Sequence, residues 1–255
     1  MKGLVCAGGE ATRLGELTRV TNKHLLPVGG WPMVYYPLQL LQRAGVREVL
    51  LVTGKQHAGQ FIDLLGNGHV PSRDGGEMLF DLDLSYKVQV EAGGIAQVVG
   101  MARKFAAGDQ LVVCLGDNIF EHSHADAINA WTKGAMVFVK DVPDPENFGV
   151  VAYGDNGTVA DIVEKAGRVD ARYESPPSND AVVGLYCYPP DVFEIIDGLR
   201  PSSRGELEIT DVNRVYAERG ELDVRRVDGW WHDGGKHWAD LADVGRLIEQ
   251  TGANK

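Results

Sequence analysis

Hydrophobic positions in the first half of the chain form two alternating patterns. Short unbroken apolar runs are typical of strands covered on both faces, and they predict strands at 2–7, 48–53, 86–90 and 111–115. Apolar residues at helical spacing lie between these runs and predict helices at 33–44, 60–65 and 95–105. This alternation predicts an α/β fold with a doubly wound, mostly parallel sheet that helices cover on both faces.

The second half of the chain is richer in strands. Its apolar runs predict strands at 135–141, 149–153, 158–164, 181–188 and 222–227. Residues 155–157, Asp-Asn-Gly, are a strong hairpin-turn signal. Helical spacing predicts helices at 192–199, 206–218 and 238–249, and Ser203 with Glu206 predicts a capping box for the second of them. We therefore expect one domain over residues 1–255, with a mixed, β-rich half built onto the doubly wound sheet.

Composition and charge narrow the class of protein. The 255 residues are 44% apolar and 24% charged, which is ordinary for a globular domain. The net charge of −11 disfavours nucleic acid as a partner, because such proteins need a basic face, yet a local basic pocket for a nucleotide is still compatible with it. No apolar run is long enough to cross a bilayer, and the apolar part of residues 1–9 is too short for a signal peptide. We expect a cytoplasmic protein without a membrane partner.

The cysteines give no sign of a metal site or of disulfides. Cys6, Cys114 and Cys187 each lie in an apolar, strand-like run, and none has a second cysteine at CxxC spacing. Three scattered cysteines of this kind indicate buried, reduced thiols.

A pair of glycines follows the first predicted strand. Gly8 and Gly9 allow backbone N–H groups to approach phosphate oxygens, and Arg13 close by suits a pyrophosphate. A glycine pair alone is more often a simple tight turn, so Arg13 is what favours a phosphate site here. GxGxxG is absent, which disfavours a nicotinamide-dependent oxidoreductase, and the GK[ST] ending of a P-loop is absent too.

A series of motifs in order along the chain resembles the sugar-1-phosphate nucleotidyltransferase family. The first two are Thr12-Arg13-Leu14 and Lys23-His24-Leu25-Leu26-Pro27. The others lie at 31–37, 89 with 94–97, 115–120, 148–151, 163–165, 182–186, 204–211 and 231–233. The resemblance covers nearly the entire chain and is greatest for members that use glucose 1-phosphate and dTTP. It implies a Rossmann-like nucleotidyltransferase fold, with a nucleotide-binding half at about 1–130 and a sugar-phosphate-binding half at about 131–255.

The resemblance also implies a reaction and a cofactor. A sugar phosphate oxygen would attack the α-phosphate of dTTP or UTP, so that glucose 1-phosphate and dTTP give dTDP-glucose and pyrophosphate. Asp117 and Asp233 match the family's metal-binding carboxylates, and two carboxylates with phosphate oxygens are typical of a Mg²⁺ site. From the residues alone, Asp117 fits an Asx turn with Asn118, and Asp233 fits a loop before two glycines.

The remaining site residues come from the same resemblance. The catalytic set would be Arg13, Lys23, Asp117 and Asp233. The nucleotide would contact Gly8, Gly9, Ala11, Thr12, Arg13, Lys23, His24, Gln89, Gly94 and Asn118. The sugar phosphate would contact Gly149, Glu164, Lys165, Val182 and Arg204. Gln89 suits a pyrimidine because its amide is both donor and acceptor.

Some of these residues have other interpretations or depart from the family. Glu164 with Lys165 also fits an exposed charge pair at a strand end, and Arg204 also fits a helix-entry role. Ala11 stands where the family usually has glycine, and His24 where it often has glutamine, which bears on the choice between thymine and uracil. Residues 70–84 make a long interval before the next strand, which we interpret as a lid or a partner surface.

Two alternatives to this function are open. One is a nucleotidyltransferase that takes a different sugar phosphate or prefers UTP. The other is a nucleotide-sugar-binding regulatory subunit without turnover, although the joint presence of Arg13, Lys23, Asp117 and Asp233 disfavours it. In either case we expect a homo-oligomer whose substrates are a nucleoside triphosphate and a sugar 1-phosphate.

Overall fold

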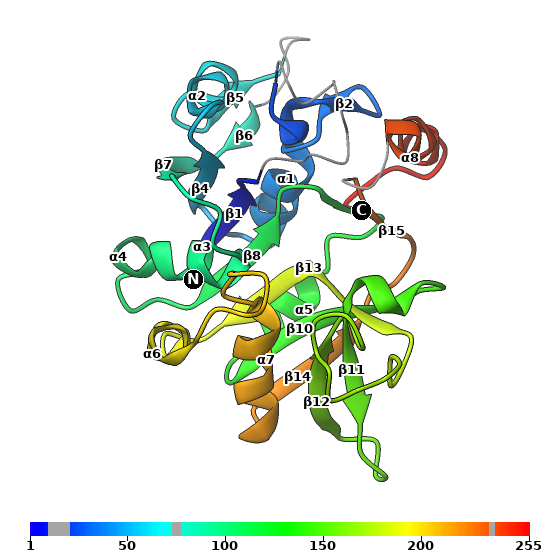
Figure 1. The fold of residues 1–255 in the computed structure, drawn as a ribbon. Coiled ribbons are helices and arrows are strands. Elements are labelled where there is room, and N and C mark those ends of the chain that lie inside the picture. Colours follow the sequence, from blue (N-terminus) through cyan, green and yellow to red (C-terminus); the bar gives the residue numbers. More distant parts are fainter. Residues whose placement is uncertain (10–20, 73–77, 235–237) are drawn as a thin grey trace. The chain divides into compact units, whose positions relative to one another are not determined.

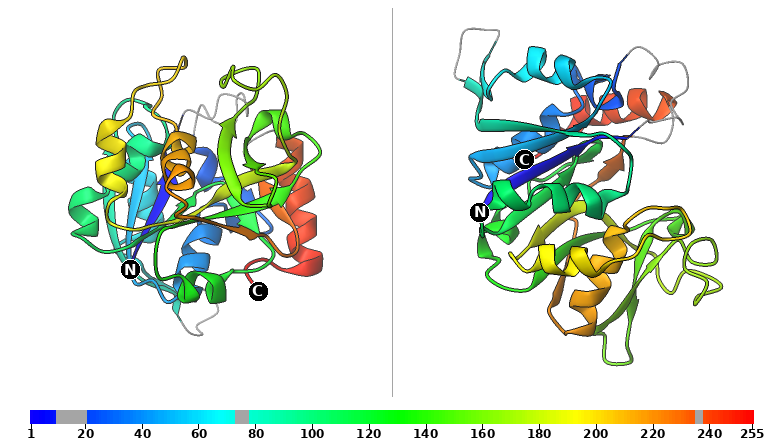
Figure 2. Two further views of the ribbon diagram at one scale, coloured as in Figure 1. Left: turned by 90° about the horizontal axis from the view of Figure 1, so that it is seen from below. Right: turned by 60° about the vertical axis from the view of Figure 1, so that its left-hand side comes forward.

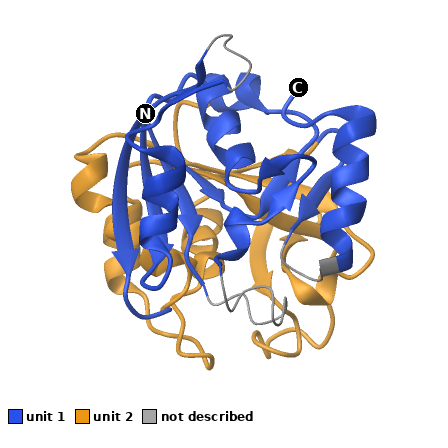
Figure 3. Ribbon diagram, turned by 90° about the horizontal axis from the view of Figure 1, so that it is seen from above, with its two compact units in different colours: residues 1–92, 112–130, 228–255 blue, residues 93–111, 131–227 orange. Residues whose placement is uncertain are grey.

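The computed structural model describes residues 1–9, 21–72, 78–234 and 238–255. The chain forms two compact units, which Figure 3 colours separately. The first unit comprises 1–92, 112–130 and 228–255, and the second comprises 93–111 and 131–227. The change at 130 agrees with the change of pattern in the sequence, but residues 228–255 return to the first unit. The single domain over residues 1–255 stays a prediction.

The first unit contains the parallel strands that the apolar runs predict (Figure 1). Strands β1 (Lys2–Ala7), β4 (Glu48–Gly54) and β7 (Asp83–Gln89) pair in parallel, and β8 (Leu111–Leu115) lies beside β1. Most residues of β1 and β4 are buried, whereas the outer strand β7 alternates between more and less exposed positions. An internal parallel strand is covered on both faces, which explains why β1 and β4 appear as unbroken apolar runs.

Helices and short strands complete the first unit. Its helices are α1 (Tyr35–Arg43), α2 (Ala58–Leu65), α5 (Ala125–Ala130), α8 (Trp238–Thr251) and the 3-10 turn η2 (Lys23–Leu25). Its short strands pair as β2 (Pro27–Val28) with β3 (Trp31–Pro32), β5 (His69–Pro71) with β6 (Met78–Asp81), and β9 (Asn118–Phe120) with β15 (Trp231–Asp233). None of these strands is long enough to produce a periodic pattern.

The interval at 70–84 is explained in part by the β5–β6 pair. The Phe80 ring lies edge-on against Tyr35 of α1, with ring centroids 4.9 Å apart. Gln42 of α1 accepts a hydrogen bond of 2.8 Å from the Asp81 backbone N–H. This hairpin is therefore packed onto α1, while residues 73–77 lie outside the described residues.

A hydrophobic cluster holds distant segments of the first unit together. It consists of Val28, Met33, Tyr36, Ile119 and Val244, all of which are buried. These residues come from β2, α1 and the segment before it, β9 and α8. The cluster fixes β9, and therefore the residues just before it, against the body of the unit.

The second unit contains a mixed sheet. Its strands are β10 (Ala135–Asp141), β11 (Gly149–Tyr153), β12 (Val159–Glu164), β13 (Asp180–Tyr188) and β14 (Leu222–Arg226). Pairing is antiparallel from β12 through β11 and β13 to β10, and β10 then pairs in parallel with β14. The predicted turn at 155–157 is confirmed, since the Gly154 N–H donates to the Thr158 carbonyl at 2.8 Å.

The helices of the second unit differ from prediction at two places. They are α3 (Ile95–Met101), α4 (Arg103–Ala106), α6 (Val192–Gly198), α7 (Ile209–Glu218) and the 3-10 turn η3 (Pro145–Asn147). The helix predicted at 95–105 is divided at Ala102, where the backbone N–H bonds back to Val99 O at 2.9 Å. Gly100 precedes this break, and a Cβ there would lie 3.3 Å from Ile196 of α6, so glycine allows close packing at the expense of helix stability.

The capping box predicted from Ser203 and Glu206 is wrong. Helix α7 begins at Ile209, its N-cap is Glu208, and no side chain caps it. Gly205 adopts a φ of +76°, and the Leu207 N–H donates to Gly93 O at 2.8 Å. The backbone before α7 is therefore used in a turn and in a contact with another segment, which delays the start of the helix. Helix α7 packs against β12, as Figure 2 shows.

The predicted fold class is confirmed: a doubly wound, mostly parallel α/β arrangement with a mixed, β-rich second part. All three cysteines are free and buried, as expected from their positions in strands. None of the helices within the described residues has both the length and the apolar character that a membrane span requires.

Candidate active site

The carboxyl ends of the parallel strands bring the glycine turn and Gln89 together. Gly8 and Gly9 follow β1, and Gln89 is the last residue of β7. A Cβ added at Gly8 would lie 2.6 Å from Oε1 of Gln89, so the amide rests against a backbone that has no side chain. Ligands of open α/β sheets bind at this edge. Ala11, Thr12 and Arg13, which belong to the same predicted phosphate loop, lie outside the described residues.

Lys23 and Asp117 form a buried ion pair. Lys23 Nζ contacts Asp117 Oδ2, and the two side chains are 15% and 14% exposed. Asn118 Nδ2 donates to the other carboxylate oxygen at 3.0 Å, and Trp231 Nε1 in turn donates to Asn118 Oδ1 at 2.7 Å. Burial acts to raise the pKa of Asp117, but the Lys23 ammonium and these hydrogen bonds outweigh it and hold the pKa well below its usual value. Asp117 is therefore a carboxylate at neutral pH.

Asn22 and His24 support this pair from both sides of Lys23. Asn22 Nδ2 donates to the Ala7 carbonyl at 3.2 Å, and Asn22 Oδ1 accepts from the His24 N–H at 2.9 Å. The His24 ring is 2% exposed, lies 2.6 Å from Asn22 Oδ1 through Nδ1, and packs against Gly116. Burial, followed by the Lys23 charge, lowers the pKa of His24 to about 3, so the ring is neutral. His24 was predicted to contact the nucleotide, and the structure places its buried ring between Asn22 and Gly116.

The second predicted metal ligand lies next to the first. In the pairing of β15 with β9, Asp233 is opposite Asn118, and the Gly234 N–H donates to the Asp117 carbonyl at 2.8 Å. Residues separated by more than a hundred positions in the chain are thus adjacent in one unit. We call Gly8, Lys23, Gln89, Asp117 and Asp233 the Lys23 cluster.

The second unit holds a separate group of predicted site residues around Glu164. Gly149 of β11 pairs with Glu164 at the end of β12. A Cβ at Gly149 would lie 3.0 Å from Thr210 Oγ1 and 3.1 Å from Glu164 Oε2, so glycine leaves room for the contact between these two side chains. Thr210 donates to Glu164 Oε2 at 2.5 Å. Lys165 Nζ lies 3.0 Å from Glu164 Oε1.

Lys165 has an uncommon backbone conformation for a residue with a side chain. Its φ is +43°, in the left-handed region. Its N–H donates to Phe148 O at 3.0 Å, and its carbonyl accepts from Arg168 and Val169 at 2.9 and 3.0 Å. The surrounding turn therefore imposes the conformation, and such local strain is concentrated at functional sites.

The other predicted residues of the second unit are placed differently. Arg204 Nη2 lies 2.7 Å from Glu208 and 3.6 Å from Glu164, so it is close to the group but held by Glu208. Val182 pairs with Val139 and packs on the core of the sheet. Gly94 has a φ of +92°, and a Cβ there would lie 2.3 Å from Leu207 O. Gly94 belongs to the second unit and Gln89 to the first. We call Gly149, Glu164, Lys165, Arg204 and Thr210 the Glu164 cluster.

Several residues that build these clusters were not predicted from the sequence. Asn22, Trp231 and Thr210 each hold a predicted site residue through a hydrogen bond. Trp231 and Thr210 lie within motifs that carry the family resemblance, which is the only signal that could have indicated them. Among the described residues, no three His, Cys, Asp or Glu side chains are grouped closely enough to hold a metal ion by themselves.

Comparisons with known proteins find relatives over most of the chain. The chain is 41% identical to the glucose-1-phosphate thymidylyltransferase of Neisseria meningitidis over 93% of this chain and 79% of that protein. It is similar to a Bacillus anthracis protein described as a glucose-1-phosphate thymidylyltransferase and crystallised with sucrose, with 39% identity, a TM-score of 0.83 and coverage of 97% and 94%. A UDP-glucose pyrophosphorylase in complex with UDP-glucose shares the fold, with a TM-score of 0.82 at 22% identity and 98% coverage of both chains.

The family assignment follows from the length of chain that matches. Residues 2–251 match the sequence profile of the nucleotidyl transferases. The match includes every strand of both units and every residue of the Lys23 and Glu164 clusters. The chain therefore belongs to the nucleotidyl transferase family.

Proposed function

We propose that this protein transfers the thymidylyl group of dTTP to glucose 1-phosphate. An oxygen of the sugar phosphate forms a bond to the α-phosphorus of dTTP, the bond from that phosphorus to the bridging oxygen breaks, and pyrophosphate leaves with the electron pair. The products are dTDP-glucose and pyrophosphate. The observation that carries the proposal is the extent of similarity to named glucose-1-phosphate thymidylyltransferases, at 39–41% identity over 93–97% of this chain.

The Lys23 cluster suits the triphosphate. Charge that develops at a phosphoryl centre must be neutralised by groups already in place. Lys23 is held by Asp117, and the glycines after β1 offer backbone N–H groups to phosphate oxygens. Arg13 is proposed to hold the same phosphates. Gln89, which rests on Gly8, would pair with the edge of the base.

The Glu164 cluster suits the sugar phosphate. The Glu164 carboxylate would accept hydrogen bonds from sugar hydroxyls, and Lys165, beside it, would bind the phosphate. Arg204 is a secondary candidate for the phosphate because Glu208 already occupies its guanidinium group. Holding both anions in the orientation for in-line attack is the main contribution that such residues make to the rate.

A magnesium ion is compatible with the donor set. Asp117 and Asp233 offer carboxylate oxygens from neighbouring positions, and Mg²⁺ commonly takes one or two carboxylates with substrate phosphates and water. Among the described residues no third His, Cys, Asp or Glu side chain joins these two, so substrate oxygens and water would supply the other ligands. When bound, the ion would neutralise phosphate charge as a Lewis acid.

The base preference defines a second candidate. Thymine and uracil share the edge that a glutamine amide recognises, and they differ by one methyl group, worth roughly 1–3 kcal/mol in a fitted pocket. We expect dTTP and UTP both to be used, with dTTP favoured. Purines should be poor substrates because their different edge would leave the amide unpaired.

The test is pyrophosphate release with glucose 1-phosphate and each of dTTP, UTP, CTP, ATP and GTP. A kcat/KM that is highest for dTTP supports the proposal. A preference for a purine, or turnover only with another sugar phosphate, would contradict it. Binding of nucleotide-sugar without turnover would instead identify a regulatory subunit.

Two further expectations go with this function. We propose that the reaction takes place in the cytoplasm, where three free, buried cysteines suit the reducing conditions. The homo-oligomeric state stays a prediction that light scattering can measure.

A further inference from the structure

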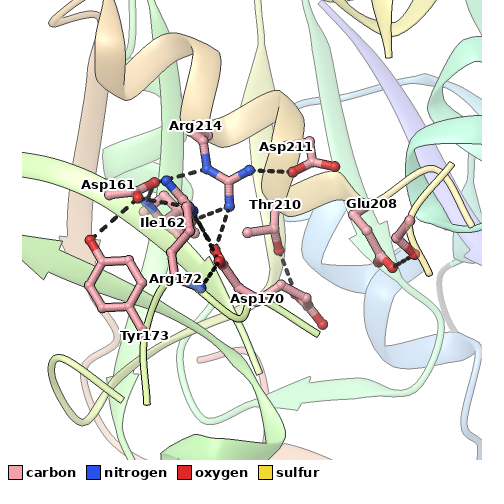
Figure 4. Close-up of polar contacts among 11 residues, drawn as sticks. Asp161, Ile162, Asp170, Arg172, Tyr173, Glu208, Thr210, Asp211 and Arg214 are labelled. Carbon is pink, nitrogen blue, oxygen red and sulfur yellow. Dashed lines mark hydrogen bonds and ion pairs between the residues drawn. The ribbon is translucent and has the colours of Figure 1, made fainter. Parts of the chain in front are cut away.

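A group of charged residues in the second unit lies beside the Glu164 cluster without belonging to it. It consists of Asp161, Asp170, Arg172, Asp211 and Arg214, and we call it the Arg214 cluster. Figure 4 shows Arg214 reaching from α7 into the middle of this group. None of these five residues is in the set predicted to contact substrate.

Arg214 is bonded at each of its guanidinium nitrogens. Its Nε lies 2.9 Å from Asp161 Oδ1, and its Nη1 lies 2.5 Å from Asp211 Oδ1. Its Nη2 donates to Asp170 Oδ2 and to the Ile162 carbonyl, both at 3.0 Å. A planar guanidinium group spreads five donors over a rigid fork and so reaches acceptors on several sides, whereas the three donors of lysine leave from one nitrogen.

Arg172 binds two of the same carboxylates from the other side. It makes a bidentate contact with Asp170, at 3.0 and 2.6 Å, and its Nη2 lies 2.9 Å from Asp161. The hydrogen bonds from Arg172 hold the pKa of Asp170 below its usual value, although burial opposes this. Asp161 and Asp170 are only 12% and 9% exposed, so each depends on its arginine partners.

The positions of these carboxylates relate the cluster to Glu164 and Lys165. Asp161 and Ile162 precede Glu164 on β12, and Asp170 lies just after the turn that Lys165 begins. The Asp170 N–H donates to the Glu164 carbonyl at 3.0 Å. Arg214 therefore joins the two ends of the turn at 164–170, inside which Lys165 keeps its φ of +43°.

Helix α7 connects the same arginine to the other side of Glu164. Thr210, which donates to Glu164 Oε2, precedes Asp211 in the first turn of α7, and Arg214 lies one turn further on. One helix thus holds the Glu164 side chain through Thr210, and through Arg214 it holds the Ile162 carbonyl before Glu164 and the Asp170 carboxylate after it.

We propose that Arg214 is a positioning residue for the sugar phosphate: it holds the turn at 164–170 in the conformation that presents Glu164 and Lys165. This inference rests on the proposed function, because it takes the Glu164 cluster as the sugar-phosphate site. It assigns to Arg214 an effect on one substrate only.

The experiment compares Arg214→Gln with wild type and with Arg219→Gln. Arg219 is the C-cap of the same helix, pairs with Asp191 at 3.0 Å and lies over the Tyr216 ring, so it controls for the loss of an arginine from this part of the chain. Arg214→Gln should raise the KM for glucose 1-phosphate about tenfold, because it removes the charge-assisted contacts that hold the turn at 164–170. It should change the KM for dTTP less than about twofold. Arg219→Gln should change neither. Arg214→Lys should recover only part of the loss, because it keeps the charge without the fork. Equal changes in both KM values, or none, would overturn the proposal.

A second variant and a second measurement keep the test valid under other outcomes. If Arg214→Gln does not fold, Arg172→Gln is the substitute, since Arg172 shares Asp161 and Asp170 but is 53% exposed. It should produce the same KM asymmetry to a smaller degree.

Amide hydrogen exchange at Lys165 and Asp170 should accelerate in Arg214→Gln and not in Arg219→Gln. Unchanged exchange would overturn the positioning role. Failure of the wild-type protein to use glucose 1-phosphate would overturn only the proposed function.

Discussion

The Lys23 and Glu164 clusters each pair a lysine with a carboxylate, yet the two pairs are supported in different ways. Around Lys23 and Asp117 the supporting groups are neutral: an asparagine on each side, a tryptophan N–H and a neutral histidine. Around Glu164 and Lys165 they are mostly charged: Arg204 lies 3.6 Å from Glu164, and Arg214 binds Asp161 and Asp170, which precede and follow the pair in the chain.

This difference shows two ways to place a cation for phosphate binding. Where neutral groups support a buried charge pair, the loss of either member leaves the other without its main counter-charge. Where several charged groups support a pair, its electrostatic stabilisation is divided among several ion pairs. The loss of one partner is then compensated in part by the others. We therefore expect large effects from single changes in the Lys23 cluster and graded effects in the Glu164 cluster.

The sharpest test of this contrast is Asp117→Asn. It keeps the shape of the side chain and removes the carboxylate that pairs with Lys23, so kcat should fall about 10²–10³-fold, or about 2.7–4 kcal/mol, as when other charge-stabilising groups are removed. The matched control is Asp126→Asn on the exposed face of α5. Pyrophosphate release at saturating substrates measures the effect, and a kcat within about tenfold of wild type would contradict the role of Asp117.

A comparison of Lys23→Met with Lys165→Met divides the two clusters by substrate. Each change removes a charge-assisted contact worth about 1.5–3 kcal/mol, so kcat/KM should fall about hundredfold in Lys23→Met and, because neighbouring charges compensate, only about tenfold in Lys165→Met. Lys23→Met should affect the use of dTTP, and Lys165→Met should mainly raise the KM for glucose 1-phosphate. Lys104→Met, at an exposed position of α4, controls for loss of a lysine. The division is wrong if both variants impair the same substrate to the same degree.

Thr210→Val tests how far the charged support can compensate. The change removes the hydroxyl that donates to Glu164 Oε2 at 2.5 Å and keeps the β-branched shape. One hydrogen bond of about 0.5–1.5 kcal/mol should raise the KM for glucose 1-phosphate roughly three- to tenfold. Thr210→Ser retains the donor and should stay near wild type. A hundredfold loss in Thr210→Val would remove the distinction between the two clusters.

The smallest effect is expected from His24→Gln, measured as stability. The His24 pKa is about 3 in the folded chain and 6.5 in the reference state, so the unfolded chain binds an extra proton between these values. The stability of the neutral ring is fully present above pH 6.5 and is lost as pH falls toward 3. The free energy of unfolding should therefore drop by about 1 kcal/mol more in wild type than in His24→Gln between pH 7.5 and 5.5. Denaturant titrations at both pH values measure this. Equal losses would show that the ring is not buried in its neutral form.

Much of the fold could be predicted from the sequence because long buried strands produce long apolar runs. Strands β1, β8, β10 and β11 have the predicted bounds. Strands β9 and β15 were not predicted, since each has three residues and is defined by its partner. The start of α7 was misplaced because the local capping signal competes with a backbone contact to Gly93 that no local pattern reveals.

The candidate site was predicted by resemblance more than by local chemistry. Asp117 and Asp233 are far apart in the chain, and only the pairing of β9 with β15 brings them together. Arg214 could not have been singled out, because an arginine in an amphipathic helix resembles any solvated residue until its three carboxylate partners are known. The roles of Ala11, Thr12 and Arg13 rest on the sequence alone.

The pairing of β9 with β15 also has a consequence for the order of events during synthesis. The hydrogen bond from Trp231 to Asn118 spans 113 positions. During synthesis, Asp233 can therefore come close to Asp117 only after the whole intervening stretch has been made. That stretch includes most of the second unit, in which β10 pairs with β14 and Ala135 lies opposite Leu222. Once these strands have paired, only the stretches 119–134 and 223–230 separate Asn118 from Trp231, and closing this shorter loop costs less entropy. Pairing within the second unit therefore lowers the entropic cost of the β9–β15 pairing that brings Asp233 beside Asn118.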